Sequence, residues 1–204
     1  MSFAFQRRRG TTSQHSTFTG LVGELTVDTD KKTVVVHDGT TAGGIPLVHA
    51  TTTDTLTNKT LTSPTINGGT LADAVIKGLE EDVNVVASAA TGTINFDVST
   101  ASIWYYTSNS TANHTLNFRY SNSVSLNTAL AVGDAITVVW LNTNGATAYY
   151  PNTIQVDGSS VTPKWQGGTA PAAGNASSID AYVFTIIKTA SATFTVLASQ
   201  TKFA

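Results

Sequence analysis

The residue types that could do chemistry are few in this sequence and lie far apart. Its four histidines, His15, His37, His49 and His114, form neither an i, i+4 pair nor an HxH pattern. One histidine per chain could still give a metal three ligands across a threefold axis, and His37, which precedes Asp38, is the best candidate for that role. A histidine that stabilises its turn is the simpler and favoured interpretation, so we predict no metal site.

The arrangements that support catalysis are missing from the sequence. Cysteine is absent, which excludes a thiolate nucleophile, a thiolate metal site and a disulfide framework. There is no GxSxG elbow to couple a serine to a base, and no GxGxxG or P-loop motif to hold a phosphate. Glycoside hydrolysis needs paired carboxylates, but Glu24, Glu80 and Glu81 are the only glutamates and the aspartates mostly occupy turns. We therefore predict no catalytic residue, no cofactor and no enzyme activity.

Aromatic side chains are the remaining groups that could recognise a ligand. Tyr149 and Tyr150 lie near a turn, and Trp165 precedes the glycine-rich segment from Gln166 to Asn175. Exposed aromatics on loops can stack on glycans or contact proteins, so these three are our candidates for surface contact. In the alternative, which we favour, Trp165 fills the core together with Trp104.

The composition is typical of a rigid β-protein. Only 12% of the 204 residues are charged and the net charge is −2, so no basic field is available to hold nucleic acid. The hydrophobic share of 41% argues against disorder. No run reaches transmembrane length, and the basic cluster at residues 7–9 is not followed by the apolar stretch of a signal peptide. We expect assembly in the cytosol without membrane insertion. The arginines either dock on an acidic partner or, as we favour, form a solvated terminus.

The segment from Gly23 to Leu47 predicts three short strands joined by tight turns. Leu25 and Val27 alternate with polar residues, and the chain returns as a valine run at residues 34–36 after a polar turn, which is the pattern of a β-hairpin. Such a small unit cannot bury its apolar surface alone. Because the valine run is apolar on both faces, we expect one face to meet another copy of the chain.

A five-residue repeat follows this hairpin. Large aliphatic side chains recur at Leu56, Leu61, Ile66, Leu71 and Ile76. The period fits neither a helix nor a simple strand, and so few repeats cannot enclose a core within one chain. We interpret the repeat as a shaft in which three chains wind together and each aliphatic side chain points at the common axis. The alternative is a threonine-rich linker with accidental periodicity.

Several linked segments near the N-terminus resemble one known family. They are TTSQHSTFTG (residues 11–20), LTVDTDK (25–31), TVVVHDG (33–39) and TAGG (41–44). Together they are similar to the N-terminal β-prism domain of the phage major tropism determinant, a family of trimeric tail-fibre receptor-binding proteins. The resemblance implies trimeric virion architecture. It covers about the first quarter of the chain and carries over no receptor-contacting residue, because the family's lectin-like domain is not recognisable.

Residues 83–204 predict one all-β domain, a β-sandwich or jelly roll. Turn dipeptides separate short strands at regular spacing, and Ala148 to Tyr150 and Ser160 to Trp165 are among the candidate strands. Alternation predicts three inward-facing lines, which are Leu116, Phe118 and Tyr120; Ile136, Val138 and Trp140; and Tyr182, Phe184 and Ile186. The sequences at 93–98, 141–151 and 164–168 also resemble a domain that recurs in structural proteins of cyanobacterial and marine phages, a resemblance that implies no biochemical role.

These observations predict an all-β chain with a trimeric β-prism at residues 1–50, an intertwined shaft at 51–82 and a knob at 83–204. The favoured function is a non-enzymatic tail fibre or spike of a phage virion, which forms a homotrimer, binds other virion proteins and contacts a host-surface glycan or protein. A capsid decoration or cement protein on a threefold axis is the alternative. A polysaccharide-degrading tailspike is a third hypothesis, of a different class.

Overall fold

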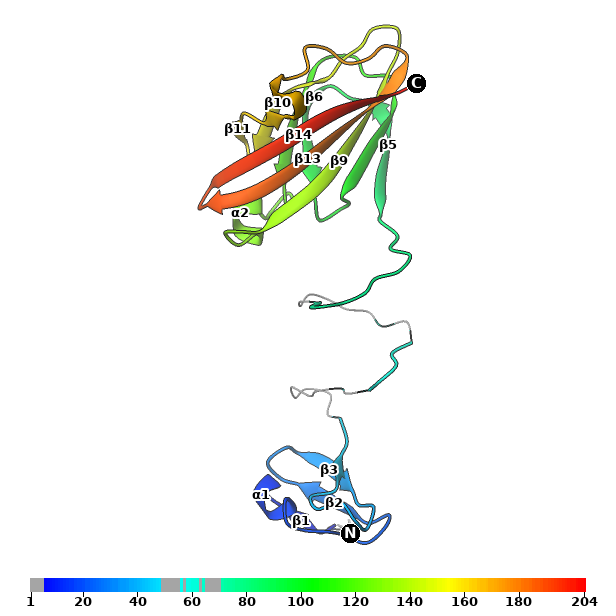
Figure 1. Cartoon of the computed structure of the whole chain (residues 1–204), viewed down its shortest axis with the longest axis vertical. Coiled ribbons are helices and arrows are strands. Elements are labelled where there is room, and N and C mark those ends of the chain that lie inside the picture. The colour runs from blue at the N-terminus through cyan, green and yellow to red at the C-terminus, as the bar shows by residue number, and fades with distance from the viewer. Residues whose placement is uncertain (1–5, 49–55, 57, 63, 65–70) are drawn as a thin grey trace, which may run out of the picture. The chain divides into compact units, whose positions relative to one another are not determined.

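A computed structural model describes residues 6–48, 56, 58–62, 64 and 71–204 of the chain (Figure 1). The chain divides into two compact units, Met1–Ala72 and Asp73–Ala204. The boundary between these units falls inside the segment 51–82, and the three domain limits given above stay a prediction. Among the described residues, no helix has the length and apolar character needed to cross a membrane.

The N-terminal unit is built on a small four-stranded sheet. Its strands are β1 (Arg9–Gly10), β2 (Leu25–Asp28), β3 (Thr33–Val36) and β4 (Ile45–Pro46), in that order across the sheet. The predicted hairpin is confirmed, because β2 and β3 pair antiparallel. Asp28 holds the turn, since its Oδ1 accepts the backbone N–H groups of Asp30 and Lys31 at 3.0 Å each.

One short helix in this unit was not predicted. Helix α1 (Thr12–His15) begins with a reciprocal capping box, in which the Thr11 hydroxyl accepts from the Gln14 backbone and the Gln14 side chain accepts from the Thr11 backbone. The spacing Thr11 to Gln14 is a recognised start signal for a helix. The segment ends after a single turn, too short for any hydrophobic period to show.

The C-terminal unit is formed almost entirely of strands, which confirms the all-β prediction for this part of the chain. Two short helical segments, α2 (Leu126–Ala129) and η1 (Gln166–Gly168), interrupt them. The strands are β5 (Val83–Ala89), β6 (Gly92–Asp97), β7 (Ile103–Ser108), β8 (His114–Arg119), β9 (Ala135–Asn144), β10 (Pro151–Val156), β11 (Ser159–Val161), β12 (Lys164–Trp165), β13 (Ser178–Ala190) and β14 (Thr193–Phe203).

These strands form two sheets between which the chain alternates. One sheet has the order β12-β14-β13-β9-β7-β5 and the other has the order β11-β10-β8-β6. From β5 to β10, successive strands belong alternately to the six-stranded and the four-stranded sheet. Neighbours within one sheet, such as β6 and β8 or β7 and β9, therefore run parallel. A jelly roll is antiparallel throughout, so the jelly-roll alternative does not describe this topology.

The core lies between the two sheets and is rich in aromatic rings. Phe118 of β8 and Phe184 of β13 meet across the layers with ring centroids 5.0 Å apart, and Phe96 of β6 stacks on Trp104 of β7 at 4.9 Å. In-register parallel pairing aligns Ile94, Leu116 and Ile154 in one row of this core. Burial of the rings supplies the main stabilisation, since each removes a large apolar area from water.

The inward lines predicted from alternation hold with one exception. Ile136 packs against the core and the other predicted residues are buried, but Tyr120 is 41% exposed because β8 ends at Arg119. Two predicted strands also differ from the structure. Residues 148–150 form no strand, and the segment 160–165 divides into β11 and β12, since Pro163 interrupts it and has no N–H for a ladder.

Candidate functional site

The histidines of the N-terminal unit serve its packing. His37 is 1% exposed and both of its ring nitrogens have partners in the same unit, the Gly20 N–H at 3.3 Å and the Thr26 hydroxyl at 2.9 Å. His15 Nε2 contacts the same hydroxyl at 2.9 Å, and its Nδ1 faces the Thr11 carbonyl at 3.0 Å. This geometry supports the structural interpretation of His37, because no lone pair is left for a metal.

The partners of these contacts assign a donor or acceptor role to three of the four ring nitrogens. A backbone N–H can only donate, so His37 accepts at Nδ1 and donates from Nε2 to Thr26. A carbonyl can only accept, so His15 donates from Nδ1. The hydroxyl of Thr26, which is 0% exposed, thus links the two rings.

Of the two other histidines, the structure describes only His114. His114 is buried in β8 beside the ring of Trp140, and burial lowers its pKa to about 4. Its Nε2 has no hydrogen-bond partner in the structure. His49 lies outside the described residues. No cluster of three or more His, Asp or Glu that could hold a metal occurs in the part of the chain that the structure describes.

The structure brings two of the three candidate aromatics together in a groove of the C-terminal unit. Tyr150 and Trp165 are half-buried, pack against the core and line a groove of about 280 Å³. The polar side chains of Asn152, Ser160 and Thr162 also line it. Trp104, by contrast, is buried in the core, as the favoured interpretation expected, while Trp165 packs against the core and also lines the groove.

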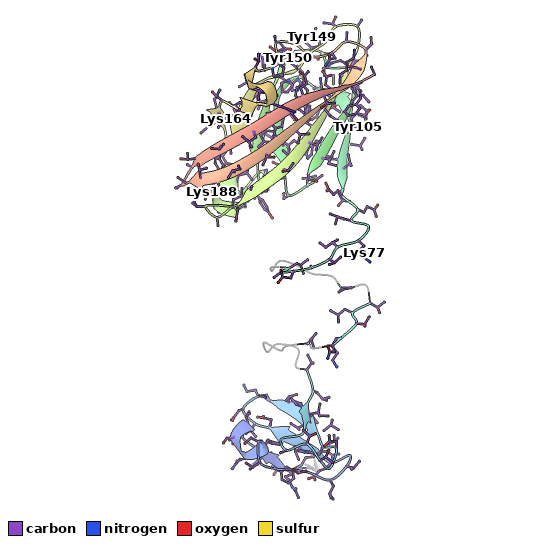
Figure 2. The ribbon with its side chains drawn as sticks, viewed as in Figure 1. Lys77, Tyr105, Tyr149, Tyr150, Lys164 and Lys188 are labelled. Atoms are coloured by element: carbon purple, nitrogen blue, oxygen red, sulfur yellow. The ribbon has the colours of Figure 1, made fainter. Side chains whose placement is uncertain are left out.

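Tyr149 lies beside this groove without lining it, and both tyrosines lie at the end of the unit opposite to Lys188 (Figure 2). Their backbone is held by buried amides. The Tyr149 carbonyl accepts from the side chains of Asn142 and Asn144 at 3.1 and 3.0 Å, and the Tyr149 N–H donates to Asn144 Oδ1 at 3.0 Å. Residues 148–150 were predicted to form a strand, and these side-chain contacts take the place of strand pairing at Tyr149.

A buried carboxylate holds the loop that precedes β13. Asp180 is 0% exposed and accepts from the Asn175 backbone at 2.8 Å, from the Asn175 side chain at 2.7 Å and from Asn144 at 3.2 Å. Burial and the neighbouring Asp180 raise the pKa of Tyr182, so its phenol stays protonated and can donate to the carboxylate. Asn144 and Asp180 thus position residues 149–150 and 175 from one network.

Sequence reasoning did not identify this network. The local signal was slight, since Asn144 stood in an Asn-Gly turn dipeptide and Asp180 in an apolar strand. A lone carboxylate at an inward position of an alternating strand, two residues before Tyr182, was the sign that could have revealed it. An inward charge must be hydrogen-bonded to be tolerated.

The groove suits an uncharged ligand. None of its lining residues, all of them described by the structure, is Asp, Glu, His, Lys or Arg. Flat rings beside amide and hydroxyl groups can stack on the apolar face of a sugar and bond its hydroxyls, or they can accept a protein loop. Among these residues, the hydroxyls of Ser160 and Thr162 have no His, Asp, Glu or Lys that could act as a base.

The aliphatic side chains of the pentad repeat are exposed wherever the structure describes them. Leu56, Leu61, Leu71 and Ile76 are 48%, 59%, 61% and 59% exposed. Ile66 lies outside the described residues. In a single chain these side chains therefore have no core to enter.

Comparison with known proteins finds similarity in the N-terminal region of the chain. Residues 6–41 match the family model described as the Major tropism determinant N-terminal domain. A "Tail fiber receptor-binding protein" of Bordetella phage BPP-1 is 72% identical over 47 residues, which are 23% of this chain and 12% of that protein. The chain thus matches about an eighth of the length of this curated relative.

Solved structures match over the same region. The Major Tropism Determinant I1, U1 and M1 variants are each 69% identical over 22% of this chain and 12% of theirs, with a TM-score of 0.22. Residues 6–41, in the first of the two units of this chain, are thus similar to the Major tropism determinant N-terminal domain.

Proposed function

We propose that the chain is a non-enzymatic structural protein of a phage virion, a homotrimeric tail fibre or spike whose C-terminal unit contacts the host surface. The observation that carries this proposal is the 72% identity of the first quarter of the chain to a protein named a tail-fibre receptor-binding protein. Identity at this level within one domain supports a shared role for that domain, which in a fibre would be assembly and attachment.

Trimer formation is supported by the exposed aliphatic repeat. Four large side chains at five-residue spacing are about half or more exposed in the isolated chain. Burying a leucine contributes roughly 2 kcal/mol, so three chains winding around a common axis would gain stability that a single chain lacks. In this proposal the segment 51–82 is the shaft, residues 1–50 form a β-prism and residues 83–204 form the knob, a virion domain with two sheets.

The groove at Tyr150 and Trp165 is our candidate for the contact with a host glycan or protein. Its uncharged lining fits a neutral sugar or an uncharged loop. One groove of this size would bind weakly, but three copies on a trimer would act together through their high effective concentration. A deep pocket in each subunit is then unnecessary.

Three measurements test this proposal. Cryo-electron microscopy of particles that carry the chain should show its density on the tail. Density on the head would refute the fibre and favour a capsid decoration protein. Analytical ultracentrifugation of the full chain should give three times the mass of one chain, and a stable monomer would refute the shaft. New reducing ends on host envelope glycans after incubation with the protein would overturn the non-enzymatic assignment.

A further inference from the structure

The outer face of the six-stranded sheet is the largest feature of the C-terminal unit that has no role so far. Side chains alternate between the two faces of a sheet. Trp140 and Tyr182 pair in register and point into the core, so the paired residues Val139 and Val183 point outward. In Figure 1 the ribbons of β14, β13 and β9 lie in front of those of β10 and β6, and this face is turned away from them.

The outer face carries no charged side chain on five of its six described strands, where a patch of apolar side chains is interspersed with threonines such as Thr137, Thr185 and Thr195. Six outward side chains from five adjacent strands define it, namely Val83, Val85, Tyr105, Val139, Val183 and Leu197. Along the paired stretches of β5, β7, β9, β13 and β14, all within the described residues, no outward position carries a charged side chain. A sheet face that remains in water normally alternates with polar and charged residues, so this composition is typical of a covered face.

Three side chains of this face are exposed within the C-terminal unit. Val85 is 61% exposed and both Val83 and Leu197 are 43% exposed. The apolar core of the unit lies on the other side of the sheet. An occupant from outside the C-terminal unit is therefore required if these side chains are to leave water.

The size of the face suits a protein interface. In flat projection it measures roughly 700 Å², from about 4.8 Å between strands and about 3.4 Å per residue. A stable interface of standard size buries about 800 Å² on each partner. The face can therefore supply almost one complete side of such an interface.

Two observations identify the occupant as a second copy of this chain. The exposed apolar side chains of Val75, Ile76 and Leu79 precede β5, and only the acidic run Glu80 to Asp82 separates them from the exposed valines of the face. In addition, the outward positions of these five strands bring no like charges together when the face meets its own copy, and Lys164 of the edge strand β12 lies at the rim beside Leu197. In a trimer that copy is always present at an effective concentration of about 1 mM.

We propose that the outer face of β5, β7, β9, β13 and β14 is the interface through which the C-terminal units of neighbouring chains pack. This inference rests on the trimer of the proposed function and extends it from the shaft into the knob. It implies that the four-stranded sheet faces outward from the assembly and that the groove at Tyr150 and Trp165 lies beside the edge of the interface, since Trp165 also lines a hollow with Val183 and Leu197.

Single-cysteine labelling of the full chain tests the interface, because the chain has no cysteine of its own. V85C places a thiol on the face, and V132C places one on a turn with matched exposure in the isolated chain, 61% against 63%. Tyr120→Cys is the matched control for Leu197→Cys, at 41% against 43%. In each pair we expect maleimide to react with the interface thiol about tenfold more slowly, since reaction then needs transient opening of the assembly.

The solution mass separates this inference from the trimer itself. A trimer in which V85C and L197C are protected supports both. A trimer in which they react as fast as their controls refutes the interface and leaves the shaft intact. A monomer refutes both the trimer and the interface. This holds even if its thiols are protected, because the protecting residues would then belong to the same chain.

Discussion

Asp157 and Lys188 hold opposite ends of the short helix α2 from different sheets. The Asp157 carboxylate, just after β10, accepts the N–H groups of Leu126 and Asn127 at 2.8 and 2.9 Å. The Lys188 ammonium on β13 donates to the carbonyls of Asn127 and Leu130 at 2.6 and 2.8 Å. Both charges have the sign that the helix ends favour. Four residues could not form a stable helix alone, so these two side chains stabilise it and join the sheets at one end of the core.

Replacing Lys188 should destabilise the C-terminal unit. Lys188→Met keeps the length of the buried stem but leaves two carbonyls without a donor, at a cost of about 2 kcal/mol. Tryptophan fluorescence during urea unfolding measures this, because Trp104, Trp140 and Trp165 all lie in this unit. Lys202→Met, at an exposed lysine, should change the midpoint little. Equal midpoints for the two variants would show that Lys188 does not stabilise α2.

Removing the hydroxyl of Thr26 should loosen the N-terminal unit alone. Thr26→Val preserves the shape but leaves His37 Nε2 and His15 Nε2 buried without a partner, which costs roughly 3 kcal/mol. Thr26→Ser retains the hydroxyl and should cost about 1 kcal/mol. Hydrogen exchange of the β2 and β3 amides should accelerate in T26V much more than in T26S. The tryptophan signal should stay unchanged, and if it shifts as strongly as the exchange, the effect is not confined to this unit.

The buried His114 should make the C-terminal unit less stable in mild acid. Its folded pKa of about 4 lies below the ordinary value of 6.5. Below pH 6.5 the unfolded chain therefore binds a proton that the folded chain does not, so stability falls as the pH drops towards 4. Between pH 7 and pH 5 we expect a loss of about 2 kcal/mol from this group. His114→Leu should remove that part of the slope in urea unfolding, and identical slopes for both proteins would contradict the assignment.

The sequence predicts the parts of this fold that depend on neighbouring residues. Alternation identifies the inward faces around Phe118, Val138 and Phe184, and the polar turn at Asp28 locates the hairpin. Alternation does not show which of the two sheets a strand joins. The strands β5 to β10 alternate between the sheets and pair in parallel with strands that are not their neighbours in the sequence, so this arrangement depends on contacts between distant residues. The position of Tyr149 depends likewise on Asn144, whose side chain also bonds to Asp180, 36 residues further along the chain.

Substitutions in the groove should weaken contact with host cells without unfolding the protein. Tyr150→Leu keeps an apolar side chain against the core but removes the ring, and Asn152→Ala removes an exposed amide of the lining. Loss of one aromatic contact in each subunit should lower the binding of labelled full chain to host cells at least about tenfold. Asn122→Ala, which lines a different hollow, is the control. Binding of Y150L and N152A at the level of N122A would exclude this groove as the contact site.

Charges placed in the pentad repeat should dissociate the proposed trimer. If Leu61 and Leu71 point at a common axis, Leu61→Asp and Leu71→Asp bring three carboxylates together in an apolar environment, which costs several kcal/mol for each trimer. Val132→Asp is a matched control, because Val132 is 63% exposed, close to the 59% and 61% of the two leucines. Sedimentation at dilute concentration should give monomers for L61D and L71D and trimers for V132D. Truncation before Leu56, which leaves the whole repeat in place, should weaken the trimer less than either charge does, since the repeat alone would still join the chains. Trimers of unchanged stability in both aspartate variants would mean that the repeat is a linker and that the chains associate elsewhere.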